Sequence, residues 1–168
     1  MTRTFELSEP ERVTVGTVGE IGRRAFYLQA REGAELVTVK LEKQQVGALA
    51  ESLGRLLQDL PRPGHPPDDE GLDLEAFDEA SFVGGTLAVA YDATVDRVVV
   101  LAEELVREEG EEGDEARLSL TREQAASVAI RGARLVEAGR PPCPLCGYPI
   151  DPRGHACPRT NGHRPPLT

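Results

Sequence analysis

The sequence predicts an α+β fold built from two similar halves, each a β-meander followed by one helix. Over the first forty residues, apolar and polar side chains alternate, which is typical of half-buried strands. The period then changes to that of an amphipathic helix, and the same succession returns in the second half of the chain. We therefore expect antiparallel sheet structure with helices covering one face.

The alternation is clearest in the first half. We expect four antiparallel strands there, at residues 4–8, 12–19, 23–32 and 35–42. In the third strand, Tyr27, Gln29 and Arg31 lie opposite the apolar residues, so this side of the sheet is expected to be exposed. Residues 43–60 follow with helical spacing, and the prolines of 61–67 end the helix.

The segment between the halves, residues 61–79, is rich in proline and acidic residues and is the expected linker or surface loop. Strand patterns return at 85–92, 96–106 and 116–120. The sequence Thr-x-x-Gln at 121–124 has the form of a capping box, so a second helix should begin there. Gly139 and the prolines after it end that helix.

The two halves align in sequence without a gap. Adding 79 to helix positions 46, 49, 50, 53 and 57 gives 125, 128, 129, 132 and 136, and the same offset takes Gln45 to Gln124. Two explanations stay open: a pattern common to all strand-to-helix junctions, or an internal duplication of residues 1–60 and 80–139. In either case, residues 1–139 form the expected α+β domain.

All three cysteines of the chain and two of its three histidines lie in residues 140–168. The candidate metal ligands are Cys143, Cys146, His155, Cys157 and His163. Zn²⁺ prefers four tetrahedral nitrogen and sulfur ligands, so we expect the three thiolates to be joined by one imidazole. Spacing alone allows either histidine. The sequence therefore predicts a zinc-binding tail, a small zinc-ribbon-like module with a structural Zn²⁺.

Two other interpretations of the cysteines stay open. Free cysteines need no metal, but four ligand-type residues within about 15 positions rarely gather by chance. A redox C-x-x-C pair opens a helix after a strand, whereas the prolines around this pair favour a loop. Three cysteines and one histidine leave no coordination position for water or substrate, so we expect the zinc to be structural rather than catalytic.

Three stretches together resemble a bacterial domain-of-unknown-function family, DUF3090: "GRRAFYLQAREGAELVTVKLEKQQV" (22–46), "GTLAVAYDATVDRVVV" (85–100) and "CPLCGYPIDPRGHACPRTNGHR" (143–164). The resemblance implies an α+β body with a C-terminal cysteine cluster. The family's Gly-His-x-Cys-Pro element matches residues 154–158, which favours His155 as the fourth ligand. The family's genes tend to lie beside those of kinase-like and histidine-phosphatase-like proteins, which implies a shared pathway but gives no chemistry.

Charge is distributed unevenly along the chain. The net charge is −10, of which residues 140–168 contribute +3, leaving −13 for the remainder. A body this acidic repels phosphate backbones, so we do not expect it to bind nucleic acid. The basic tail could contact nucleic acid or dock on its own acidic body, and we favour docking. The cysteines are clustered, and the sequence has no apolar run of about 20 residues and no apolar signal core. We therefore expect a cytoplasmic protein.

No catalytic constellation stands out in the sequence. The glycines of 16–22 favour a hairpin turn over a phosphate site because no helix follows them, and those of 83–86 favour a bulge or the start of a strand. We therefore expect a non-catalytic adaptor that binds a protein partner through the sheet face or the acidic loop 103–116. The alternatives are a nucleic-acid-binding protein that uses Arg153, Arg159 and Arg164, and an enzyme in which Arg23, Arg24, Lys40 and Lys43 hold an anionic ligand.

Overall fold

The computed structural model of the protein describes residues 2–20, 22–65 and 71–137. The chain divides into two units after Val136, and the fold below is that of the first unit, Met1–Val136. Its strands are β1 (Thr4–Leu7), β2 (Arg12–Val18), β3 (Ala25–Glu32), β4 (Glu35–Leu41), β5 (Phe82–Asp92), β6 (Arg97–Glu104) and β7 (Glu115–Leu120). Its helices are α1 (Lys43–Gln58) and α2 (Arg122–Glu137). The predicted α+β class is confirmed.

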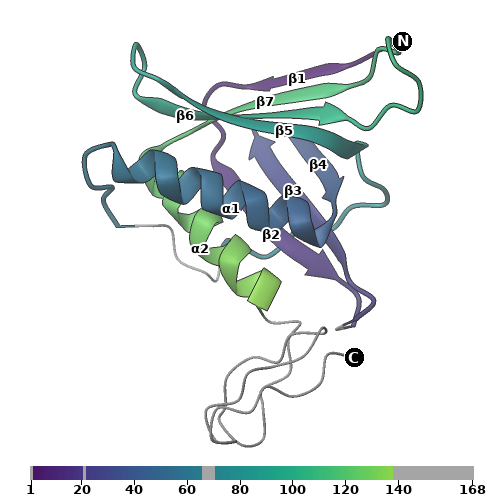
Figure 1. Ribbon diagram of the computed structural model, residues 1–168, viewed down its shortest axis with the longest axis horizontal. Helices are drawn as coiled ribbons and strands as arrows, with labels where there is room; N and C mark the ends of the chain where they lie inside the picture. Colours follow the sequence, from purple (N-terminus) through teal and green to yellow (C-terminus); the bar gives the residue numbers. More distant parts are fainter. Residues whose placement is uncertain (1, 21, 66–70, 138–168) are drawn as a thin grey trace, which may run out of the picture. The chain divides into compact units, whose positions relative to one another are not determined.

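The strands form one seven-stranded sheet in the order β1-β7-β6-β5-β4-β3-β2 (Figure 1). Two antiparallel meanders, β2-β3-β4 and β5-β6-β7, are joined where the first residues of β5 run parallel to β4. At the far edge, β1 runs parallel to β7. The prediction of an antiparallel sheet is therefore wrong, because the sheet is mixed. The expected four-stranded first meander is also wrong, because β1 pairs with the other half of the chain.

Contacts at the N-terminus hold β1 beside β7. The backbone N–H of Arg3 donates to Asp114 Oδ1 at 2.7 Å, and its guanidinium Nε donates to Asp114 Oδ2 at 3.0 Å. Asp114 is only 8% exposed, so this ion pair is partly shielded from water. The Arg3 guanidinium also donates to the carbonyl of Ser81, just before β5. These long-range contacts, rather than local alternation, place β1.

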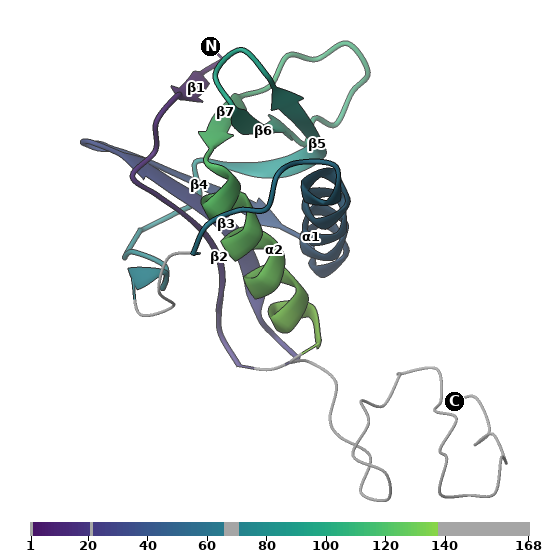
Figure 2. The ribbon, with the colours of Figure 1, turned by 90° about the vertical axis from the view of Figure 1, so that its left-hand side faces the viewer.

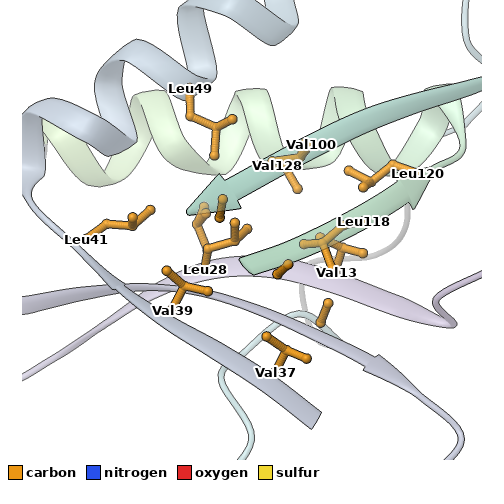
Figure 3. Close-up of a cluster of buried hydrophobic side chains, with 14 of the residues drawn as sticks. Val13, Leu28, Val37, Val39, Leu41, Leu49, Val100, Leu118, Leu120 and Val128 are labelled. Carbon is orange, nitrogen blue, oxygen red and sulfur yellow. The ribbon is translucent and has the colours of Figure 1, made fainter. Parts of the chain in front are cut away.

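The core lies between the sheet and the two helices, which cover one face of it (Figures 1 and 2). Figure 3 shows side chains from β2, β3, β4, β6 and β7 meeting Leu49 of α1 and Val128 of α2. Each fully buried Leu or Val of this kind contributes roughly 1.5–3 kcal/mol of hydrophobic stabilisation. Gly132 allows the helices to approach closely, since a Cβ there would lie 3.1 Å from that of Ala50. No helix in the described part of the chain is long and apolar enough to cross a membrane.

The turns confirm the interpretation of the glycine motifs. Gly19 and Gly22, in the hairpin loop between β2 and β3, have positive φ angles of 105° and 92°, which non-glycine residues rarely adopt. The pairing of β5 with β6 shifts register between Gly84 and Thr86, which is the predicted bulge.

Each half of the sheet contributes a segment to the other half. Leu7 of β1 pairs with Leu118 of β7, and Phe82 of β5 pairs with Val39 of β4, both in parallel. Val39 and Leu118 are equivalent positions under the sequence offset of 79. Both explanations of the aligned halves stay open: a pattern common to strand-to-helix junctions, or an internal duplication.

Candidate binding surface on the outer face of the sheet

The outer face of β2–β4, which is turned away from the helices, carries a connected set of side-chain contacts. Its side chains are mainly polar or charged: Arg12, Thr14, Gly16, Tyr27, Gln29, Arg31, Thr38 and Lys40. Residues 72–81, which we call the strap, lie across this face on the side opposite α1 and α2 (Figure 2). The strap forms no helix or strand of its own.

A row of three polar residues binds the backbone of the strap. Thr14, Gln29 and Thr38 are neighbours in the strand register, and each is at most 2% exposed. Thr14 Oγ1 donates to the carbonyl of Leu72 at 2.5 Å. The Gln29 amide donates to the carbonyl of Glu75 at 3.2 Å and accepts from its N–H at 2.7 Å. The Gln29 amide therefore pairs with both backbone groups of Glu75, a contact that does not depend on the Glu75 side chain.

The end of the strap is fixed by the third member of the row. Ser81 N–H donates to the carbonyl of Thr38 at 2.6 Å, and the Thr38 N–H donates to Ser81 Oγ at 3.1 Å. The next residue, Phe82, begins β5. The strap is therefore anchored at its C-terminal end by the start of a strand.

Two arginines on the same face hold the one strap carboxylate that points toward the sheet. Arg31 Nε lies 2.8 Å from both carboxylate oxygens of Glu75, and Arg12 contributes a nitrogen 3.2 Å from one of them. The hydrogen bond from Arg31 lowers the pKa of Glu75 below its usual range, and the same contact raises the pKa of Arg31. The buried Nε of Arg12 has no acceptor among the described residues.

Apolar contacts complete the surface beside the arginines. Leu74 packs directly over Gly16, where an added Cβ would lie 2.6 Å from Leu74 Cγ. The ring of Phe77 meets that of Tyr27 edge-on, with centroids 4.8 Å apart. Leu74 and Phe77 thus flank Glu75 and add apolar contacts on both sides of its ion pair with the arginines.

A cavity of about 660 Å³ lies alongside the strap, near the edge strand β2 and the end of α2. Its lining includes Gly16, Val18, Tyr27, Leu74, Phe77 and Arg131. Arg131 Nε donates to the carbonyl of Val15 at 3.3 Å, and its guanidinium lies 3.9 Å from Asp73. The cavity is therefore bounded by apolar and aromatic groups, with charged groups at its rim.

The structure separates the four cations proposed for an anionic ligand. Lys40 and Arg23 are exposed, and Arg24 stacks over the ring of Phe26, 5.6 Å from its centroid. None of the four lines the cavity described above. Neither Arg24 nor Lys40 lines the cavity beside the strap or the hollow beside the acidic loop, so neither of these two sites is the pocket that would favour an enzyme.

The predicted metal ligands and the arginines proposed for nucleic-acid binding lie outside the described residues. These are Cys143, Cys146, His155, Cys157, His163, Arg153, Arg159 and Arg164. In residues 2–20, 22–65 and 71–137, no three His, Cys, Asp or Glu side chains are placed to hold a metal ion. The acidic loop before β7 borders a hollow of about 340 Å³ whose lining includes Glu103, Glu111 and Asp114.

The expectation that Gln29 is exposed is wrong, because the strap covers it. Part of the expected linker, residues 61–79, thus lies on the sheet, and Leu72 is only 4% exposed. A signal for this was present in the sequence. Leucines at 72 and 74 followed by Phe77 give an acidic stretch an apolar pattern that a fully solvated loop does not need.

The fold and this surface together define an α+β protein whose mixed sheet holds an extended segment on its outer face. Residues 5–157 match the family described as "Protein of unknown function (DUF3090)", and the chain belongs to this family. Comparison with curated proteins and with solved structures returned no match.

Proposed function

We propose that the protein is a non-catalytic binding protein, an adaptor that holds a protein partner at the surface formed by the outer face of β2–β4 and the strap. The observation that carries this proposal is the pair of buried side chains of Thr14 and Gln29, which bond to the backbone of an extended segment. The backbone of Thr38 continues this row by bonding to Ser81 at the end of the segment. Hydrogen bonds to the backbone of an extended segment supply affinity in recurring modes of peptide recognition, and pockets for its side chains supply specificity. The cavity beside the strap adds apolar and aromatic area of the kind that anchors a partner side chain.

The second part of the proposal concerns the tail. Cys143, Cys146, His155 and Cys157 would hold one structural Zn²⁺, with His163 as the alternative fourth ligand. The support is chemical: the chain places all of its cysteines in one short stretch, among prolines that restrict the unbound loop. Thiolate ligands stay reduced in the cytoplasm, so we propose that compartment for the protein.

Site-specific photo-crosslinking tests the binding role. A benzoylphenylalanine placed at Asp78, an exposed strap residue that borders the cavity, should crosslink one specific protein in native cell extract. The matched control is the same group at Glu51, an exposed acid on α1 that faces away from this surface. Crosslinking from position 78 but not from position 51 is the expected result. No product from position 78, or identical products from both positions, contradicts the proposal.

A further inference from the structure

We propose that the strap is a displaceable occupant of the outer face of β2–β4, and that the partner is an acidic, extended segment that takes its place. This inference rests on the proposed function and names the class of partner. The segment has the pattern that the strap itself shows from residue 72 onward: Leu-x-Leu-Glu-x-Phe. Each position of this pattern has a defined contact on the sheet.

The surface beneath the strap can exist without it. Opposite the core, strands β2, β3 and β4 present mainly threonine, glutamine, arginine, lysine and tyrosine side chains, with the half-buried Leu36 among them, rather than a second apolar layer. When the strap leaves, water can satisfy the hydrogen-bonding groups of Thr14, Gln29 and Thr38. The hydrophobic core lies on the other side of the same strands and stays covered by α1 and α2. Release of the strap therefore exposes mainly polar surface.

The strap is held by contacts that are modest in area. Within it, only Leu72 is buried, while Leu74, Glu75 and Phe77 are half-buried and Asp73, Ala76, Asp78 and Glu79 are exposed. It crosses the strands instead of extending the sheet, so it adds no continuous ladder of backbone hydrogen bonds. A segment with few buried apolar contacts opens at lower free energy than the core does.

The strap also leaves one buried hydrogen-bond donor of the surface without an acceptor in the described residues. The buried Nε of Arg12 finds no acceptor in the described residues, although Arg12 and Arg31 both face Glu75. A buried donor without a partner weakens the bound arrangement. A segment with a second acceptor near this position would bind both arginines more completely than the strap does, which gives an acidic partner an advantage over the strap.

The contacts define what the partner must present. The carboxylate at the position of Glu75 meets two arginines, which selects an acidic residue there. The leucine before it lies over Gly16, where any larger residue on the sheet would close the space. The aromatic residue two positions after the acid packs edge-on against Tyr27. The adjoining cavity leaves room for side chains of the incoming segment that are larger than those of the strap.

A peptide-binding experiment on the full chain tests this inference. The probe is a fluorescein-labelled peptide of residues 71–81, "GLDLEAFDEAS", measured by fluorescence anisotropy. A double variant, Leu74→Asp with Phe77→Ala, weakens the contacts of the strap with the sheet, and we call it the released variant. This variant should bind the probe at least tenfold more tightly than the unmodified chain. Adding Arg31→Ala to it should abolish that gain, because Arg31 holds the glutamate of the probe.

Two results would overturn the inference. One is a released variant that keeps its circular dichroism spectrum yet binds the probe no better than the unmodified chain. The other is a released variant that fails to fold, which would make the strap part of the folded core.

Hydrogen exchange on the unmodified chain gives an independent test that needs no substitution. The N–H of Glu75 bonds to Gln29, whereas the N–H of Leu28 lies in the centre of the sheet. If the strap opens without unfolding the sheet, the Glu75 amide should exchange at least a hundredfold faster than that of Leu28. Equal exchange free energies would mean that the strap leaves only on global unfolding, and the inference would fail.

The two proposals fail in different ways. Suppose that position 78 crosslinks a specific protein in cell extract but the released variant does not bind the probe. This result would support the protein-binding role and contradict the proposed displacement of the strap. Suppose instead that the released variant binds the probe tightly but position 78 crosslinks no protein. This result would support a displaceable strap and contradict the protein-binding role in that extract.

Discussion

Gln45 and Gln124 make the same kind of contact at equivalent positions in the two halves of the chain. Each side-chain oxygen accepts from the backbone N–H three residues earlier, at 2.7 Å for Gln45 and 2.9 Å for Gln124, as in a capping box. Each side-chain nitrogen then donates to a carbonyl of the other half: Gln45 to Gly84 and Gly85, and Gln124 to Pro10. The two glutamines therefore join each helix start to the exchanged segment beside it.

Replacing either glutamine should destabilise the protein by a similar amount. Gln45→Ala and Gln124→Ala each remove a helix-cap contact and leave carbonyl groups without a donor, at a cost of about 1–2 kcal/mol. Urea unfolding followed by circular dichroism measures the change. Gln44→Ala is the matched control, because Gln44 is an exposed neighbour on α1 without such contacts, and it should leave the stability within about 0.5 kcal/mol. If Gln44→Ala lowered the free energy of unfolding as much as Gln45→Ala, the role assigned to the Gln45 side chain would be contradicted.

The same substitution should have opposite effects at two glycines. Gly16→Ala places a Cβ 2.6 Å from Leu74 Cγ, so the strap must shift, and we expect a loss of about 1–3 kcal/mol. Gly54→Ala lies inside α1 with no atom within 4 Å of the new Cβ, so it should gain about 0.5–1 kcal/mol from helix propensity. Denaturant midpoints of the two variants check the signs. A stabilising Gly16→Ala would mean that Leu74 does not pack on Gly16.

The contact between Arg3 and Asp114 predicts a dependence of stability on pH. The backbone N–H of Arg3 is the main cause that lowers the pKa of Asp114 in the folded protein. A lowered carboxylate pKa stabilises the fold at pH values above the unfolded value, about 3.9, and this contribution disappears as the pH falls through the folded value. Asp114→Asn should therefore cost about 1–3 kcal/mol at pH 7, and the difference from the unmodified protein should shrink below about pH 4.

Urea unfolding from pH 7 down to pH 3 measures this difference. Glu112→Gln serves as the control, because Glu112 is an exposed acid in the same loop. It should show no comparable change with pH. The assigned ion pair would be contradicted if the free energy of unfolding of Asp114→Asn differed from that of the unmodified protein by the same amount at pH 7 and at pH 3.

The helices and the alternation of the sheet could be predicted because both depend on local sequence. The capping box at Thr121 and Gln124 is a four-residue pattern, and the strand faces follow from a period of two. The structure confirms that box. The second glutamine cap, at Gln45, was not predicted because the residue at the N-cap is Glu42, not serine or threonine.

The mixed sheet and the covered outer face could not be predicted in the same way. The place of β1 depends on the contact between Arg3 and Asp114, and that of the strap on the contact between Gly16 and Leu74. Both contacts join residues far apart in the chain, so a local pattern such as Leu72, Leu74 and Phe77 can indicate burial without showing which residues meet. The parallel pair of β4 and β5 needs a long crossover, which α1 and the segment after it provide.

Zinc content is the measurement that tests the proposed metal-binding role most directly. Purified protein, analysed for metals by inductively coupled plasma mass spectrometry, should contain one zinc per chain. Cys143→Ser and His155→Ala should each lose the metal, whereas His163→Ala should keep it. Loss in His163→Ala with retention in His155→Ala would assign the fourth ligand to His163. Unmodified protein without bound zinc, after expression in zinc-supplemented medium, would contradict the proposed metal site.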